Sequence, residues 1–194
     1  MARVKLRSRR EVVALCEALG EGLHGALARL PDDEDDPGVI EAVWSGEALG
    51  TLLWALEAVE LPPYDRPFEA ERLLAASLDG AALRPAEEIE RARETARLWH
   101  WRARTALLQS GDEVELPEGW HSFDQLVAAT AMRGHDRGLL PRPLRGDFPA
   151  FATDFRKLAD DQRLEVHQIA WERHRALNWL CGLGKTWDEV PTDT

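Results

Sequence analysis

Apolar residues recur at helical spacing along most of this chain, in segments separated by prolines, glycines and acidic residues. Apolar positions three and four residues apart are typical of amphipathic helices. The segments with this pattern are 8–30, 40–59, 68–78, 85–107, 120–133 and 160–180. No run of β-branched residues alternates with polar ones, which is the pattern expected of strands. We therefore predict an all-α fold, a single-domain irregular helical bundle of about six or seven helices.

Local signals mark where several of these helices begin and end. Ser8 and Glu11 have the spacing of a capping box, and Pro85 is placed at the start of the fourth segment. Ser122 is a candidate N-cap, and Gly182 follows the last helix. Residues 49–56 are almost entirely apolar, so we expect the second helix to be central and flanked by amphipathic ones.

Chain length favours one domain over residues 1–194. Residues 134–150 are rich in glycine, proline and arginine, which predicts a loop-rich excursion. At the other end, Trp187 and Val190 are candidate anchors for an ordered C-terminal tail at 185–194.

The last helix places a cation among apolar residues. At about 100° per residue, Arg173 falls inside the arc of Val166, Ile169 and Leu177, whereas His174 and Asn178 line the next arc. A cation that faces a core needs acceptors around it. His100 lies in the apolar stripe of 85–107, and arginines 93, 97 and 104 flank it. We therefore predict a polar cluster of His100, Arg173, His174, Asn178 and a tail carboxylate, with Asp188 and Asp193 as the candidates.

Composition excludes some classes of function. The net charge of −11 and a pI near 5.0 argue against a partner with a phosphate backbone, so we predict no nucleic-acid binding. The longest uncharged stretches, 48–56 and 176–184, fall far short of a bilayer span, so we predict no membrane insertion. Cys16 and Cys181 lie in apolar patterns typical of buried thiols, and nothing resembles a signal peptide, so we predict a cytoplasmic protein.

Several blocks of residues resemble one family of uncharacterised, largely bacterial proteins, catalogued as domain of unknown function 4272. The blocks are Arg7-Ser8, Glu11-Val12, Trp44, Glu47-Ala48-Leu49, Leu52 to Leu56, Pro62-Pro63, His100-Trp101, Phe148, Phe151, Leu158, Glu172-Arg173-His174, Ala176 to Leu180, Trp187-Asp188 and Val190 to Thr194. This resemblance implies a helical fold and no particular activity. It also implies that many members have a further N-terminal segment, which this chain would lack.

Candidate chemistry is limited. His167 and His174 are seven residues apart, about 10.5 Å along a helix, which is too far for both to bind one ion. We found no zinc, phosphate-loop or dinucleotide motif, and we predict no metal or cofactor.

Two functional hypotheses remain open, and the sequence does not decide whether the protein is an enzyme. The first is a non-enzymatic module that binds a protein partner or itself, with Trp101 and Trp120 as a candidate interaction surface. The second is a small-molecule-binding or hydrolytic site built on His100, Arg173 and His174. If a protein carboxylate closes off Arg173, that arginine serves the fold instead.

Overall fold

The bundle is formed by a row of long helices. The computed structural model describes residues 5–109, 116 and 118–194, and these contain six α-helices, one short 3-10 helix and a two-stranded sheet. The α-helices are α1 (Arg9–Arg29), α2 (Pro37–Ala55), α3 (Ala70–Leu74), α4 (Ala86–Gln109), α5 (Phe123–Asp136) and α6 (Asp160–Leu180). The 3-10 helix spans Phe155–Lys157. The protein is therefore all-α, as predicted.

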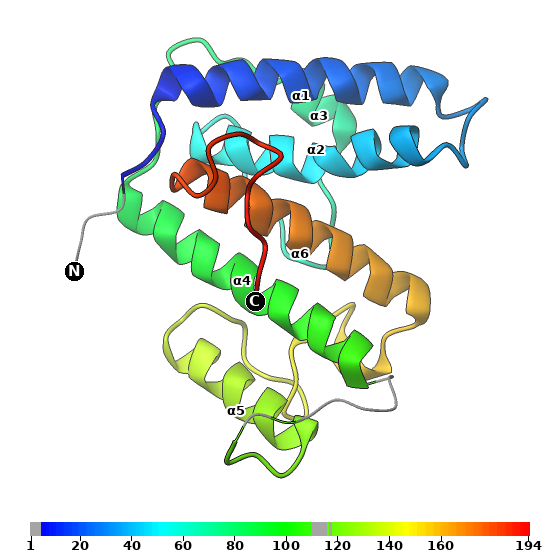
Figure 1. Ribbon diagram of the computed structural model, residues 1–194, viewed down its shortest axis with the longest axis vertical. Coiled ribbons are helices and arrows are strands. Elements are labelled where there is room, and N and C mark those ends of the chain that lie inside the picture. The colour runs from blue at the N-terminus through cyan, green and yellow to red at the C-terminus, as the bar shows by residue number, and fades with distance from the viewer. Residues whose placement is uncertain (1–4, 110–115, 117) are drawn as a thin grey trace.

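Packing places two helices in the middle of the row. Helix α2 packs between α1 and α6, and α6 packs between α2 and α4, whereas α5 contacts the outer side of α4 (Figure 1). Because α2 and α6 are covered on two sides, both are buried over most of their second halves. The apolar run at 49–56 explains the position of α2.

The predicted helix signals operate as expected. Ser8 and Glu11 form the capping box of α1, and the Ser122 side chain accepts from the Gln125 backbone N–H at the start of α5. Gly182 has a φ of 79°, a conformation that glycine adopts readily, and it follows the end of α6.

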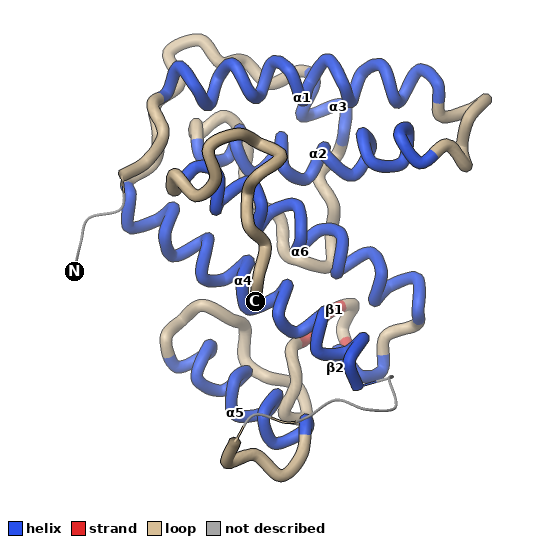
Figure 2. The backbone as a smooth tube through the Cα atoms, viewed as in Figure 1, coloured by secondary structure: helices blue, strands red, loops and turns tan. Residues whose placement is uncertain are grey.

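The excursion after α5 differs in part from the prediction. Its first residues, 134–136, still belong to α5. Its last two residues form β1 (Pro149–Ala150), which pairs with β2 (Thr153–Asp154) just beyond the predicted segment in the small hairpin shown in Figure 2. The two residues between the strands, Phe151 and Ala152, have φ values of 48° and 59°. A two-residue hairpin turn of this kind normally uses asparagine or glycine, so phenylalanine and alanine at these positions carry no signal for a turn.

The C-terminal tail lies against the bundle. Its backbone carbonyl at Pro191 accepts a hydrogen bond of 2.8 Å from Asn178, and the Trp171 indole donates to Thr192 over 3.2 Å. The Arg175 guanidinium stacks on the Trp187 ring, with its Cζ atom 4.3 Å from the ring centroid. In Figure 1 the tail crosses α6 and ends at α4.

Candidate functional site

Arg173 points into the interior of the bundle, in agreement with its helical phase. Its side chain is 0% exposed, and its Nε donates to Glu47 Oε2 on α2 over 2.8 Å. Its terminal nitrogens donate to the backbone carbonyls of Pro62 at 2.6 Å and of Arg66 at 3.0 Å. The guanidinium is therefore enclosed by acceptors of the protein itself.

The carboxylate that neutralises Arg173 does not come from the tail, and this corrects the prediction. Glu47 of α2 is the carboxylate that pairs with Arg173, and its other oxygen, Oε1, accepts a hydrogen bond of 2.7 Å from the Phe68 backbone N–H. Asp188 instead lies 3.8 Å from Arg175 and is 92% exposed, and Asp193 is exposed as well. Since Arg173 is closed off by a carboxylate, it ties the 57–69 loop to α2 and α6 and is not free to bind a substrate.

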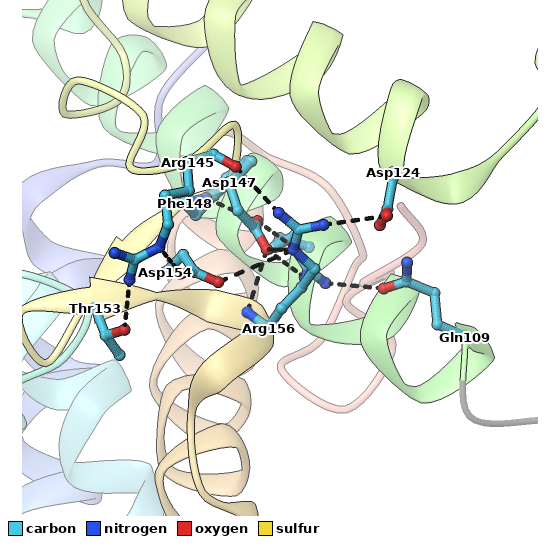
Figure 3. A network of polar contacts seen from close by, with 9 residues as sticks. Gln109, Asp124, Arg145, Asp147, Phe148, Thr153, Asp154 and Arg156 are labelled. Atoms are coloured by element: carbon cyan, nitrogen blue, oxygen red, sulfur yellow. Dashed lines mark hydrogen bonds and ion pairs between the residues drawn. The ribbon is translucent and has the colours of Figure 1, made fainter.

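A second buried arginine was missed by the sequence analysis. Arg102 of α4 makes a two-pronged ion pair with Asp147, at 2.7 and 2.8 Å, and both side chains are at most 1% exposed. The Asp147 carboxylate also accepts from the backbone N–H groups of Phe148 and Arg156. Figure 3 shows this network between α4 and the hairpin region. A bidentate pair with further donors to the carboxylate is a stable way to bury both charges.

The same network reaches the surface through two more arginines. Arg156 lies 3.1 Å from Asp124 of α5 and 3.6 Å from Asp147, and Arg145 donates to Asp154 over 2.5 Å (Figure 3). Each cation is thus matched by a carboxylate. This matching indicates a role in holding α5 and the hairpin against α4.

Two predicted residues, His100 and His174, do meet in the interior. His100 on α4 is 2% exposed, His174 on α6 is 1% exposed, and their Nδ1 atoms are 3.1 Å apart. On its other side, His174 Nε2 lies 3.0 Å from Asn178 Nδ2, which also donates to the Pro191 carbonyl. Three of the predicted cluster residues therefore form one chain of hydrogen bonds, and Arg173 is not part of it.

Donor and acceptor roles along this chain follow from its last member. The Pro191 carbonyl only accepts, so the Asn178 atom that faces it is the NH2 group, and its second hydrogen points to His174 Nε2. His174 then carries its proton on Nδ1 and donates it to His100 Nδ1. A neutral His100 consequently carries its own proton on Nε2.

His100 lines an open cavity between α4 and α6. The cavity has a volume of about 460 Å³ and is lined by His100, Arg104, Leu107, His167, Gln168, Trp171 and Thr192. Among the described residues, His100 Nε2 has no hydrogen-bond partner. Of the described side chains, the enclosed atoms without a partner are Tyr64 Oη and Glu172 Oε2, so His100 Nε2 is not enclosed. A donor on a buried ring is therefore accessible from the cavity. We call this cavity the histidine cavity.

The three histidines here are held neutral. Burial lowers the pKa of His100 to about 3 and that of His174 to about 4, and it also lowers the pKa of His167. Nearby cations act in the same direction: Arg104 on His100 and His167, and arginines 93 and 97 on His174. At neutral pH the donors of the cavity are therefore N–H groups of neutral imidazoles beside the charged Arg104.

His167 belongs to the cavity although it is not in the hydrogen-bonded chain. Its ring centroid lies 5.8 Å from that of His100, and the side chain is half-buried. Among the described residues, no group of three or more His, Cys, Asp or Glu side chains is arranged to hold a metal ion.

Trp101 and Trp120 are both half-buried, so neither ring stands out as an exposed apolar contact. Trp101 packs against Phe148 at a centroid distance of 6.4 Å and lines a cavity of about 310 Å³ with Arg97 and Arg133. The most exposed large apolar side chains of the described helices are Leu107, Leu164 and Met132. Of the two predicted surface residues, Trp101 thus contributes to packing.

Glu172, next to Arg173, is a buried carboxyl group to which the sequence analysis assigned no role. It is 1% exposed, and among the described residues its Oε2 atom has no hydrogen-bond partner. Burial raises the pKa of Glu172 to about 7, against the opposing effect of Arg175. It lines none of the cavities described above, so it is a cost to the fold and not a candidate ligand contact.

A wider cavity of about 780 Å³ borders the 57–69 loop and α3. Although Pro62 and Arg66 line it, their carbonyls face Arg173, which is itself 0% exposed. This cavity therefore gives no access to the Arg173 guanidinium.

Compared with known proteins, the chain matches no family model, no curated protein and no solved structure. Membership in the family that the sequence resembles therefore stays a prediction. Every helix that the structure describes is too short or too polar to serve as a membrane span. The case for a function consequently depends on the geometry of the histidine cavity.

Proposed function

We propose that this protein binds a small molecule in the histidine cavity between α4 and α6. The observation that carries the proposal is the chain from Pro191 through Asn178 and His174 to His100, which leaves an oriented N–H donor at the cavity. A volume of about 460 Å³ is in the range of small-ligand sites. Buried polar groups that converge on a cavity are the usual mark of such sites.

The same chain favours binding over acid–base catalysis. A general base needs a lone pair directed at the substrate, but the assigned tautomer of His100 presents a proton on Nε2. Asn178 cannot pass a proton to His174 and His100 to restore their protonation after a reaction, because an amide is not an acid at neutral pH. His100 therefore acts as a fixed hydrogen-bond donor, and the hydrolytic alternative has less support.

Histidine-selective NMR tests this function. The protein, with ¹⁵N-labelled histidine, is titrated with millimolar malonate, inorganic phosphate, malonamide, glucose and 1,3-diaminopropane in turn. We expect at least one compound to shift the His100 and His167 signals while His24 and His121, which lie outside the cavity, stay in place. If none of the five compounds shifts His100 or His167, the proposed function is wrong.

A second candidate function is association with a protein partner or with a second copy. It is favoured by Leu107 and Leu108, which are 62% and 47% exposed near the end of α4, and by Leu164, which is 57% exposed in α6. Light scattering over a range of protein concentrations tests self-association. A mass that stays at that of one chain, together with an unchanged mass for Leu107→Ser, would exclude a dimer built on these leucines.

A further inference from the structure

One face of α4 carries three arginines that form no ion pair within the described part of the chain, together with the neutral His100. Arg93, Arg97, His100 and Arg104 are spaced by four, three and four residues, so they form one stripe along the helix. Among the described residues, none of these three arginines forms an ion pair with a carboxylate. By contrast, Arg102 within α4, Arg84 just before it and Arg137 at the end of α5, which pairs with Glu94 of α4, each have a carboxylate partner.

The histidine cavity lies at the C-terminal part of this stripe. Its described lining offers the Arg104 guanidinium, the His100 N–H, the His167 ring and the Gln168 amide, and it includes no carboxylate. The only hydrogen bond of Arg104 among the described residues is a long one, 3.4 Å, to the Thr194 hydroxyl. In a protein with a net charge of −11, the described residues that line this cavity thus include one ionised group, the Arg104 cation.

This lining is selective in charge. A guanidinium and an imidazole N–H both donate, and such donors bind the oxygens of carboxylates and phosphates in short charge-assisted hydrogen bonds. A cationic ligand would meet Arg104, and the described lining residues supply no carboxylate to offset the repulsion. A neutral ligand would leave the charge of Arg104 to solvent alone.

We infer that the ligand of the histidine cavity is a small anion, a carboxylate or a phosphate, whose oxygens are held by Arg104 and by His100 Nε2–H. His167 is the third donor in reach of the same anion. The inference rests on the proposed function, since it names the chemical class of the molecule that this cavity binds. It assigns recognition of the anion to Arg104 and orientation of the donor to the chain that begins at Asn178.

The probes separate ligand charge from ligand shape. Malonate and malonamide have nearly the same size and differ in charge, 1,3-diaminopropane supplies the opposite charge, and phosphate distinguishes a phosphate site from a carboxylate site. At constant ionic strength, we expect malonate, phosphate or both to shift His100 and His167. Malonamide and 1,3-diaminopropane should leave both signals unchanged.

A matched pair of variants tests the arginine. Arg104→Gln should weaken binding of the anion by at least about tenfold, because a charge-assisted bond is lost. Arg142→Gln, which removes an equal charge from an exposed loop position outside the cavity, should stay within about twofold of the wild type. Arg104 is exposed, so its variant is expected to fold, and a thermal melt verifies this.

Each other outcome has a definite meaning. If malonamide, glucose or 1,3-diaminopropane shifts His100 and His167 but neither anion does, the class of ligand is wrong and the binding function stands. If Arg104→Gln binds the anion as tightly as the wild type, Arg104 is not the recognition group and the inference is overturned. If no compound binds, the function fails, and the inference fails with it.

Discussion

Arg173 and His100 are both buried polar groups, but their surroundings differ in one respect. The nitrogens of Arg173 donate to a carboxylate on α2 and to carbonyls of the 57–69 loop, and the side chain is 0% exposed. His100 uses one nitrogen for His174 and leaves the other at a cavity. A buried polar centre in which every nitrogen already has a protein acceptor stabilises the fold, whereas a centre with an oriented donor left over has the means to bind a ligand.

Removing Arg173 should produce the largest loss of stability. Arg173→Ala strands the Glu47 carboxylate in the interior, so we expect the free energy of unfolding to fall by ~3–5 kcal/mol. Urea unfolding of the wild type and the variant measures this difference in free energy. Arg163→Ala, which breaks an exposed pair with Asp160, is the control and should cost less than ~1 kcal/mol. A loss below ~0.5 kcal/mol for Arg173→Ala would mean that the closed centre does not hold the loop.

The histidine pair should dominate the acid side of the stability profile. The pKa values of His100 and His174 are lowered from 6.5 to about 3 and about 4, so these groups stabilise the fold fully above pH 6.5. Below that pH the unfolded chain takes up protons that the folded protein excludes. At about 1.4 kcal/mol per pH unit and group, we expect a loss of roughly 2–4 kcal/mol by pH 5.

Urea unfolding across this pH range measures the slope, and the variants show its source. Replacing both His100 and His174 with glutamine should flatten the slope between pH 6.5 and pH 5, whatever it does to stability at pH 7. Equal slopes in the wild type and the double variant would show that the pair is charged or solvated in the folded protein.

Glu172 gives a third case, a buried group with an unpaired oxygen and no cavity. Its pKa is raised from 4.5 to about 7 in the folded protein. As the pH rises from 4.5 to 7, the unfolded chain releases this proton more readily than the folded protein does, so the free energy of unfolding falls. Glu172→Gln should therefore stabilise the protein by ~1–3 kcal/mol at pH 8 and by little at pH 4.5. Thermal or urea unfolding at the two pH values measures the difference, with exposed Glu21→Gln as the control. An equal effect at both pH values would contradict the assigned cause.

Arg104 should have the smallest effect on the fold. It is exposed and has no carboxylate partner among the described residues, so Arg104→Gln should change the free energy of unfolding by less than ~0.5 kcal/mol, as should Arg142→Gln. The same urea experiment measures both. A loss above ~1 kcal/mol for Arg104→Gln would place this residue with the structural arginines.

Much of this architecture could be predicted from local signals. Capping residues and apolar periodicity located the helices, and the phase of α6 placed Arg173 inside, because those properties depend on residues close together in the chain. The acceptor of Arg173 could not be found in this way. Glu47 lies 126 residues away, and its role depends on the packing of α2 on α6.

The predicted cluster divided in two for a geometric reason. Arg173 and His174 are consecutive on α6, so their side chains point about 100° apart, and α6 lies between two other helices. Arg173 accordingly meets α2 and His174 meets α4. Arg102 was missed because it lies about 60° beyond the Trp99 edge of the α4 stripe. Only the folded hairpin region, which supplies Asp147, turns that position into an interior one.

One measurement compares the two centres directly. Histidine and arginine side chains labelled with ¹⁵N are observed in the same sample during a titration with malonate or phosphate. We predict that His100 carries its proton on Nε2 before the anion is added, that His100 and His167 shift as it binds, and that Arg173 Nε does not move. A His100 ring without a proton on Nε2, or an Arg173 signal that shifts together with the histidines, would contradict the separation of a closed structural centre from an open binding site.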